Sequence, residues 1–275
     1  MNSAAPHPPV WVVSFPERQP YAPLWELQKR LWAQRWAGRI PDTLLLLEHD
    51  PVVTLGKNAR RENLLLPTAL FRERGVEVVE VDRGGDVTYH GPGQLVGYWI
   101  FDLHGLRPDV HWYLRSIEEV LIRTLRRFGL EGGRDPKATG VWVDGRKVAA
   151  MGMHLSHWVS THGFALNLNT DLAPFSWIVP CGLTGREVTS MRALRARAAG
   201  GTGAAVPEAA VPEVVRREVE LVLVEEAAAL FERTVTELTP LELSDILMQL
   251  ERRAGPEPGG EEDGAWSSRR ASCPA

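Results

Sequence analysis

The 275-residue chain contains two cysteines in very different surroundings. Cys181 lies in the pentapeptide Val179-Pro180-Cys181-Gly182-Leu183, whereas Cys273 lies two residues before the end of the chain. Proline fixes its own backbone and favours an extended residue before it, and glycine removes a neighbouring side chain. We therefore expect Cys181 to lie on a turn with open space beside its sulfur. Burial as a small hydrophobic side chain is the alternative interpretation.

A reactive thiol needs a positive charge or a base nearby, because a thiol with a pKa of ~8.5 is only about 3% ionised at pH 7. Lys147 opens a strand after the Asp144-Gly145 turn and precedes the apolar run 148–151, so partial desolvation would lower its pKa. A solvated lysine at the end of a hairpin is the alternative. The candidate partners of Cys181 are Lys147, His90, His154, His157, His162 and Arg186.

A glycine-rich segment, residues 83–98, carries several hydrogen-bonding side chains. Its five glycines would allow a backbone to approach a ligand closely, although a turn-rich connection between two core strands has the same composition. The glycine spacing does not match a dinucleotide-binding motif, and no Gly-Lys-Ser or Gly-Lys-Thr occurs. His154 and His157 have no further cysteine or histidine at ligand spacing. We expect no cofactor and no metal site.

Composition is typical of a globular protein, with 44% hydrophobic and 24% charged residues, enough for one large domain or two small ones. No apolar stretch approaches the ~18 residues of a membrane helix, and residues 1–9 lack the pattern of a signal peptide, so we expect a cytoplasmic protein. Residues 1–206 carry a net charge of +4 and residues 207–275 a net charge of -8. This charge is too small to indicate nucleic-acid binding.

The hydrophobic pattern predicts an α+β fold, a mixed β-sheet with flanking helices. Helices are expected over residues 23–39 and 109–128, and again over 212–238 and 241–253. Asp144-Gly145 predicts a tight hairpin. Strands are expected at 10–15, 43–48, 52–55, 77–81, 95–103, 141–143, 147–155 and 160–168.

Four segments follow from this pattern. We expect a catalytic domain over residues 1–195 and an alanine- and glycine-rich linker over 196–206. A helical C-terminal segment follows over 207–253, and residues 254–275 have the composition of a disordered tail.

Six blocks of sequence together resemble the octanoyltransferase family of lipoate biosynthesis, also called lipoyl(octanoyl) transferases or lipoate-protein ligase B. The resemblance covers about residues 10–195. Its blocks are LLLLEH at 44–49 with TLG at 54–56, RGGDVTYHGPGQLVGY at 83–98, GVWV at 140–143, RKVAAMG at 146–152, HGFALNLN at 162–169, and PCG at 180–182 with VTSM at 188–191.

The resemblance implies a fold similar to the catalytic domains of biotin and lipoate protein ligases. It also implies that Cys181 takes an octanoyl group from octanoyl-acyl-carrier protein as a thioester, and that Lys147 lowers the pKa of the cysteine and transfers the proton. The acceptors implied are lysines on the lipoyl domains of 2-oxoacid dehydrogenases and on the glycine cleavage H protein. We expect a monomer. The substrate-binding residues that the resemblance implies are Arg83, Gly84, Gly85, Asp86, Val87, Thr88, Tyr89, His90, Ala150, Met151, Gly152, Gly163, Phe164 and Ala165.

Two other functions fit parts of the sequence. An ATP-dependent lipoate or biotin protein ligase would share the fold and depend on a lysine, but it needs no cysteine nucleophile. A non-catalytic acyl-binding protein would keep the pocket without needing Lys147 and Cys181 together. The presence of both residues favours the transferase.

Overall fold

A mixed sheet of eight strands forms the centre of the computed structural model, which describes residues 8–179, 187–200 and 206–254. The strand order is β11-β1-β2-β6-β10-β9-β8-β7. Strands β11, β1 and β2 run parallel, and each later neighbour is antiparallel. The strands are β1 (Val10–Ser14), β2 (Thr43–Leu47), β6 (Gln94–Ile100), β7 (Gly133–Asp135), β8 (Ala138–Val143), β9 (Arg146–Ser156), β10 (Val159–Asn167) and β11 (Val235–Leu238).

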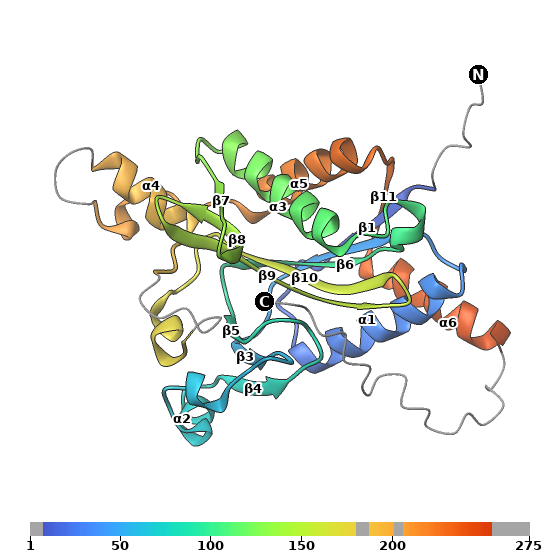
Figure 1. Ribbon diagram of the computed structural model, residues 1–275, viewed down its shortest axis with the longest axis horizontal. Helices are drawn as coiled ribbons and strands as arrows, with labels where there is room; N and C mark the ends of the chain where they lie inside the picture. Colours follow the sequence, from blue (N-terminus) through green and yellow to red (C-terminus); the bar gives the residue numbers. More distant parts are fainter. Residues whose placement is uncertain (1–7, 180–186, 201–205, 255–275) are drawn as a thin grey trace.

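Helices cover both faces of this sheet. Helices α3 (Val110–Arg127) and α5 (Arg216–Phe231) pack on one face, and α1 (Tyr21–Trp36) and α6 (Pro240–Ala254) pack on the other (Figure 1). Every residue of β2 and β6 is buried, as expected for central strands covered on both sides. Helix α3 begins at the predicted place because the Asp109 side chain accepts a hydrogen bond from the backbone N–H of Trp112.

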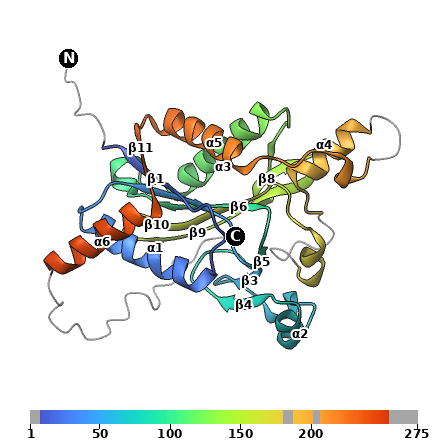
Figure 2. The ribbon, with the colours of Figure 1, turned by 180° about the vertical axis from the view of Figure 1, so that it is seen from behind.

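A smaller sheet of three strands lies on the α1 side of the large sheet, as both views show (Figures 1 and 2). Its order is β4-β3-β5, with β3 (Val52–Leu55), β4 (Glu77–Glu80) and β5 (Val87–His90). Helix α2 (Thr68–Glu73) buries Phe71 in the core of this sheet. The backbone N–H of Gly84 donates to the Met153 carbonyl oxygen at 2.7 Å, which joins the small sheet to β9.

The predicted strands and the Asp144-Gly145 hairpin are confirmed, with Asp144 and Gly145 both at positive φ. The glycine-rich segment 83–98 is more regular than a turn-rich connection, because it contains β5 and most of β6. Helix α4 (Met191–Ala199), capped by the Ser190 hydroxyl, runs into the predicted linker 196–206.

The prediction of one helix over 212–238 is wrong. Helix α5 ends at Phe231, where Glu232 adopts a left-handed conformation with φ of 53°, and the chain then forms β11 beside β1. The predicted helical segment 207–253 therefore contributes a strand to the large sheet. The predicted end of the catalytic domain at residue 195 stays a prediction, and the predicted tail 254–275 lies outside the described residues apart from Ala254 at the end of α6.

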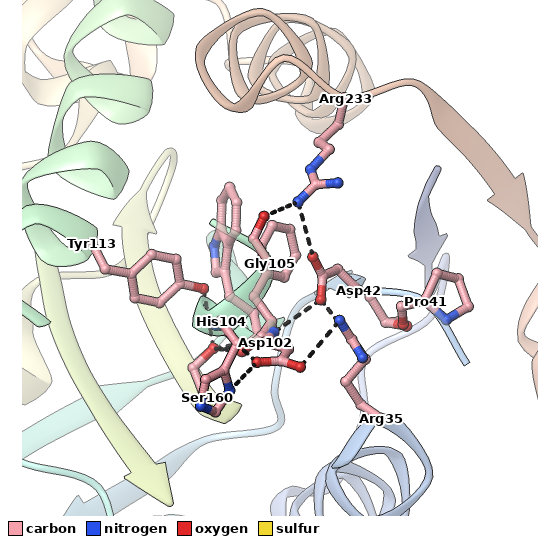
Figure 3. A network of polar contacts seen from close by, with 12 residues as sticks. Arg35, Pro41, Asp42, Asp102, His104, Gly105, Tyr113, Ser160 and Arg233 are labelled. Carbon is pink, nitrogen blue, oxygen red and sulfur yellow. Dashed lines mark hydrogen bonds and ion pairs between the residues drawn. The ribbon is translucent and has the colours of Figure 1, made fainter. Parts of the chain in front are cut away.

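A buried charge network ties this C-terminal region to the rest of the fold (Figure 3). Asp42 accepts a hydrogen bond from Arg35 Nε at 2.7 Å and from the backbone N–H of Asp102 at 2.9 Å. Arg233, which follows α5, lies 4.0 Å from Asp42 and donates to the Gly105 carbonyl oxygen at 3.0 Å. The network therefore connects α1, the start of β2, the end of β6 and the turn before β11.

We expect Asp42→Ala to lower the free energy of unfolding by about 3 kcal/mol, because the buried Arg233 would lose its carboxylate and Arg35 would keep only its 3.5 Å contact with Asp102. Asp42 is 5% exposed. Urea denaturation measures the change. The control is Glu80→Ala, which removes an exposed ion pair with Arg61 and should cost about 1 kcal/mol or less. Equal losses in the two variants would contradict a stabilising role for the network.

Candidate active site

A cavity of about 450 Å³, open space at its mouth included, lies between β5, the β6–β10–β9 part of the large sheet and the start of α1. We call it the main cavity. The residues lining it are Tyr21, Arg83, Gly85, Thr88, His90, Val96, Tyr98, Ala150, Met151, Gly152, His162, Gly163, Phe164 and Ala165.

Ten of the fourteen residues predicted to bind substrate line the main cavity. The other four are Gly84, Asp86, Val87 and Tyr89. Side chains alternate along a strand, so Thr88 and His90 of β5 lie at the cavity whereas Val87 and Tyr89 pack into the core of the small sheet. The Asp86 side chain instead accepts a hydrogen bond from the backbone N–H of Arg60 at 3.2 Å.

Four lining residues were not among the predicted binding residues. Val96 and Tyr98 lie two residues apart on β6 and therefore on the same face of the sheet. The alternation of the strand would have predicted both residues once the face at the cavity was known. His162 was predicted only as a candidate partner for Cys181. Tyr21 is the first residue of α1, and no local sequence feature indicates that it reaches this site.

Glycines allow the loop 83–85 to close over the cavity. A Cβ atom on Gly152 would lie 2.7 Å from the Gly84 carbonyl oxygen, so only glycine fits where β9 meets this loop. Arg83 is fixed on the other side, where its Nη2 donates to the carbonyl oxygen and the hydroxyl of Thr54, each at 2.8 Å. The wall of the cavity is therefore rigid at this point.

Lys147 lies at a second cavity of about 280 Å³ that shares Thr88, Ala150 and Ala165 with the main cavity. Lys147 is 6% exposed, and its Nζ lies 4.9 Å from the centre of the Trp142 ring. Its backbone N–H donates to the Glu187 carbonyl oxygen, and its carbonyl oxygen accepts from the Thr189 N–H, both at 2.9 Å. Residues lining the second cavity are Thr88, Gln94, Lys147, Ala150, Ala165, Asn167, Phe175 and Val188.

Cys181 lies outside the described residues, as do the other residues of segment 180–186. The described residues on both sides of this segment are held by backbone hydrogen bonds. Val179 N–H donates to the Asn63 carbonyl oxygen at 2.8 Å, and Glu187 accepts from Lys147. The described residues that follow segment 180–186 are therefore anchored to Lys147 through Glu187.

A directed chain of hydrogen bonds connects the two cavities. Asn167 Nδ2 donates to the Thr189 carbonyl oxygen at 2.9 Å, so its Oδ1 accepts from Gln94 Nε2 at 2.9 Å. Gln94 Oε1 then faces His90 Nδ1 at 2.8 Å, and this nitrogen must carry the proton. Burial, together with the nearby His49 and Arg83, lowers the pKa of His90 to about 3. His90 is therefore neutral at pH 7, with its Nε2 lone pair available.

His49 is a second buried neutral imidazole, and it lies behind Tyr98. Its Nδ1 faces the Gln19 carbonyl oxygen at 2.9 Å and carries a proton, so its Nε2 accepts from the Tyr98 hydroxyl at 2.6 Å. Burial lowers the pKa of His49 to about 4 and raises the pKa of Tyr98. Tyr98, which lines the main cavity, and His49 behind it are thus both uncharged.

His162 is held by an aspartate. Its Nε2–H donates to Asp82 Oδ1 at 2.9 Å, and the same oxygen accepts from Trp25 Nε1 at 2.9 Å. Burial lowers the pKa of His162. Burial alone would raise the pKa of Asp82, but the hydrogen bond from His162 helps to lower it to about 2. The pair is therefore a neutral imidazole on a carboxylate.

His154 and His157, which the sequence did not favour as a metal pair, lie near the tip of the β9–β10 hairpin. Within the described ranges, no three histidine, cysteine, aspartate or glutamate side chains are grouped so that they could hold a metal ion. No helix in the same part of the chain is both long and apolar enough to cross a membrane.

The buried histidines predict that acid destabilises the fold. A histidine with a depressed folded-state pKa contributes stability above its unfolded pKa of 6.5 and loses it as the pH falls toward the folded value. Lowering the pH from 7 to 5 should therefore cost roughly 2 kcal/mol for each of His49 and His90. Unfolding by urea at several pH values measures this, and His49→Gln should remove roughly 2 kcal/mol of the dependence. Equal stability at pH 7 and pH 5 would rule out two buried neutral imidazoles.

Solved structures of lipoate protein ligases share this fold. A lipoate-protein ligase A crystallised with ATP superposes with a TM-score of 0.63 at 14% identity, covering 89% of this chain and 94% of that one. A bipartite lipoate protein ligase from Thermoplasma acidophilum superposes with a TM-score of 0.58 at 16% identity, covering 90% of this chain and 92% of that one. The predicted mixed-sheet fold and its likeness to lipoate protein ligases are confirmed.

Sequence comparison gives the family. The lipoyl protein ligase A/B catalytic domain matches residues 20–204. An octanoyltransferase from Solibacter usitatus is 55% identical over 178 residues, which are 65% of this chain and 80% of that protein. One from Gloeobacter violaceus is 54% identical over 173 residues, 62% of this chain and 75% of that protein. The chain therefore belongs to the lipoyl protein ligase A/B catalytic domain family and, within it, to the octanoyltransferases.

Proposed function

We propose that this transferase takes an octanoyl group from octanoyl-acyl-carrier protein, holds it as a thioester on Cys181, and passes it to the lysine amine of a lipoyl domain. The family supports octanoyl transfer in protein lipoylation. Beyond this activity of the family, we propose the donor, the thioester on Cys181 and the lysine acceptor.

One observation carries the proposal: a buried lysine lies where an apolar cavity ends, and its backbone is paired with the chain that follows Cys181. Lys147 shares a cavity with Ala150 and Ala165, which also line the main cavity. The pairing of Lys147 with Glu187 and Thr189 holds the described residues that follow segment 180–186 beside Lys147. An acyl chain in the main cavity would thus have its carboxyl end near Lys147.

The first step exchanges one thioester for another. Lys147 accepts the thiol proton, the Cys181 thiolate attacks the donor carbonyl carbon, and the donor C–S bond breaks. The carrier thiolate leaves and takes the proton from Lys147. A thioester is made as another is broken, so the step needs no ATP.

The second step forms an amide. The unprotonated amine of the target lysine attacks the acyl carbon, a C–N bond forms, and the bond to Cys181 breaks. The proton lost by the amine returns through Lys147 to the sulfur. Because an amide is more stable than a thioester, this step drives the transfer forward.

In this scheme the acyl chain lies along small and apolar side chains of the main cavity. Val96, Phe164 and Ala165 supply apolar contacts, while Gly152 and Gly163 leave space. Arg83, which donates a hydrogen bond to the Thr54 carbonyl oxygen, holds the loop 83–85 over the acyl chain. Of the residues predicted to bind substrate, Asp86 acts indirectly in this proposal by holding the backbone at Arg60.

We expect intact-mass spectrometry of the full chain, mixed with octanoyl-acyl-carrier protein, to show one octanoyl adduct that is absent in Cys181→Ser. The serine keeps the size of the side chain but lacks a readily ionised nucleophile. Cys273→Ser is the matched control and should acquire the adduct as the wild type does. A wild type that acquires no adduct and transfers nothing unless ATP is added would instead indicate a ligase.

Replacing Lys147 separates proton transfer from positive charge. Lys147→Ala should slow adduct formation by about 100-fold or more, in the range of general acid–base effects. Lys147→Arg keeps the charge but cannot release a proton at neutral pH, so it should remain slow. Rapid-quench measurement of the adduct gives both rates. An arginine variant as fast as the wild type would limit Lys147 to an electrostatic role.

A further inference from the structure

The residues that line the main cavity differ in chemistry along β10. The main cavity shares Thr88, Ala150 and Ala165 with the cavity of Lys147. His162 lines the same cavity three residues before Ala165 on β10, and its ring lies edge-on to Tyr98 with ring centres 6.1 Å apart. A chain whose carboxyl end lies near Lys147 would therefore point its methyl end at His162.

His162 is fixed more firmly than an ordinary wall residue. It is 2% exposed, its Nε2–H donates to Asp82 at 2.9 Å, and its backbone N–H donates to Gln28 Oε1 at 2.7 Å. Its φ of 59° is unusual for a residue other than glycine in a strand. Such a conformation persists only when several contacts hold it, and it is typical of functional sites.

The side chains that hold His162 are polar. Gln28 is fully buried, and the Asp82 carboxylate also accepts from Trp25 Nε1 at 2.9 Å. Methylene groups pushed past His162 would lie against these groups or would break the hydrogen bond between His162 and Asp82. Both outcomes are unfavourable, because buried polar groups lose stability when they lose their partners.

The distance from Ala165 to His162 along β10 matches a chain of medium length. Three residues of a strand span about 10 Å at roughly 3.3 Å per residue. An extended octanoyl chain has seven C–C bonds of about 1.5 Å and advances about 9 Å. Four more carbons would add about 5 Å and would pass the ring.

We propose that His162, positioned by Asp82, forms the end wall of the acyl cavity and limits the acyl chain to about eight carbons. This inference rests on the proposed function and adds the residues that determine its chain-length specificity. His162 contacts the acyl methyl end, and Asp82 is a positioning residue that acts through the ring.

The test compares kcat/KM of the full-length protein for acyl-carrier-protein thioesters of eight and twelve carbons, with a lipoyl domain as acceptor. His162→Gly removes the ring and tolerates the positive φ. His162→Asn, which also tolerates this conformation, is a second variant with a shorter side chain. The matched control is His157→Gly, since His157 has a φ of 50° in the same hairpin but is exposed and does not line the main cavity.

We expect the wild type and His157→Gly to favour the eight-carbon donor by about 10-fold or more, as a closed apolar site does against extra methylene groups. His162→Gly should reduce this ratio by about 10-fold, and His162→Asn and Asp82→Ala should reduce it in the same direction. A loss of folding would lower both rates but leave their ratio unchanged.

Two failures are distinguishable. If the wild type transfers octanoyl groups but the His162 and Asp82 variants keep the wild-type ratio, the end wall is disproved and the proposed function stands. If the wild type transfers no acyl group from either donor, the proposed function fails and the end wall fails with it.

Discussion

The site depends on the close approach of the large sheet and the small sheet, which glycines at their boundary allow. The loop 83–85 lies between Gly56 and Gly152, and a Cβ atom at either glycine would collide with the backbone of this loop. The hydrogen bond from the Gly84 N–H to the Met153 carbonyl oxygen then joins β9 to the loop between β4 and β5 of the small sheet. Because the loop is held on both sides, β5 can present Thr88 and His90 to a cavity whose floor is the large sheet.

Most polar groups around this cavity are neutral, and this has a physical reason. Burial depresses the pKa of His49, His90 and His162, so each imidazole uses one nitrogen as a donor and keeps the other as an acceptor. Their donors are satisfied by a backbone carbonyl, an amide oxygen and a carboxylate. A neutral imidazole in the wall can contact an alkyl chain without the cost of desolvating a charge. The Asp82 carboxylate is kept behind the His162 ring, and the Lys147 amine lies at the other cavity.

Sequence patterns predicted those parts of the fold whose determinants are local. The apolar spacing and the Asp109 cap located α3, and Asp144-Gly145 located the β8–β9 hairpin. Strand β5 was not predicted, because glycines on both sides hid a run of only four residues. The β11 strand was absorbed into a predicted helix, since only the left-handed Glu232 and the partner strand β1 distinguish it.

In the site, too, sequence patterns predicted the features that are determined locally. Motif resemblance located most of the cavity, but it could not separate Thr88 and His90 from Val87 and Tyr89, since that depends on which face of β5 is turned to the large sheet. Tyr21 and His162 depend on tertiary structure, the former on the start of α1 and the latter on a backbone conformation fixed by Gln28 and Asp82. Cys181 and the segment around it lie outside the described residues, so the partnership of Cys181 with Lys147 stays a prediction.

The C-terminal elements have a structural role that follows from the edge of the sheet. Without β11, strand β1 would expose unpaired backbone groups along its parallel edge, a site for non-native pairing. Helix α5 adds Val219, Leu223 and Phe231 to the core on one face, and α6 adds Leu243 and Leu247 to the core on the other. Among the described residues of α5, β11 and α6, none lines the main cavity or the cavity of Lys147. The C-terminal elements therefore contribute to the stability of the sheet that carries Lys147 and His162, and Arg233 connects them to this sheet through its contact with Asp42.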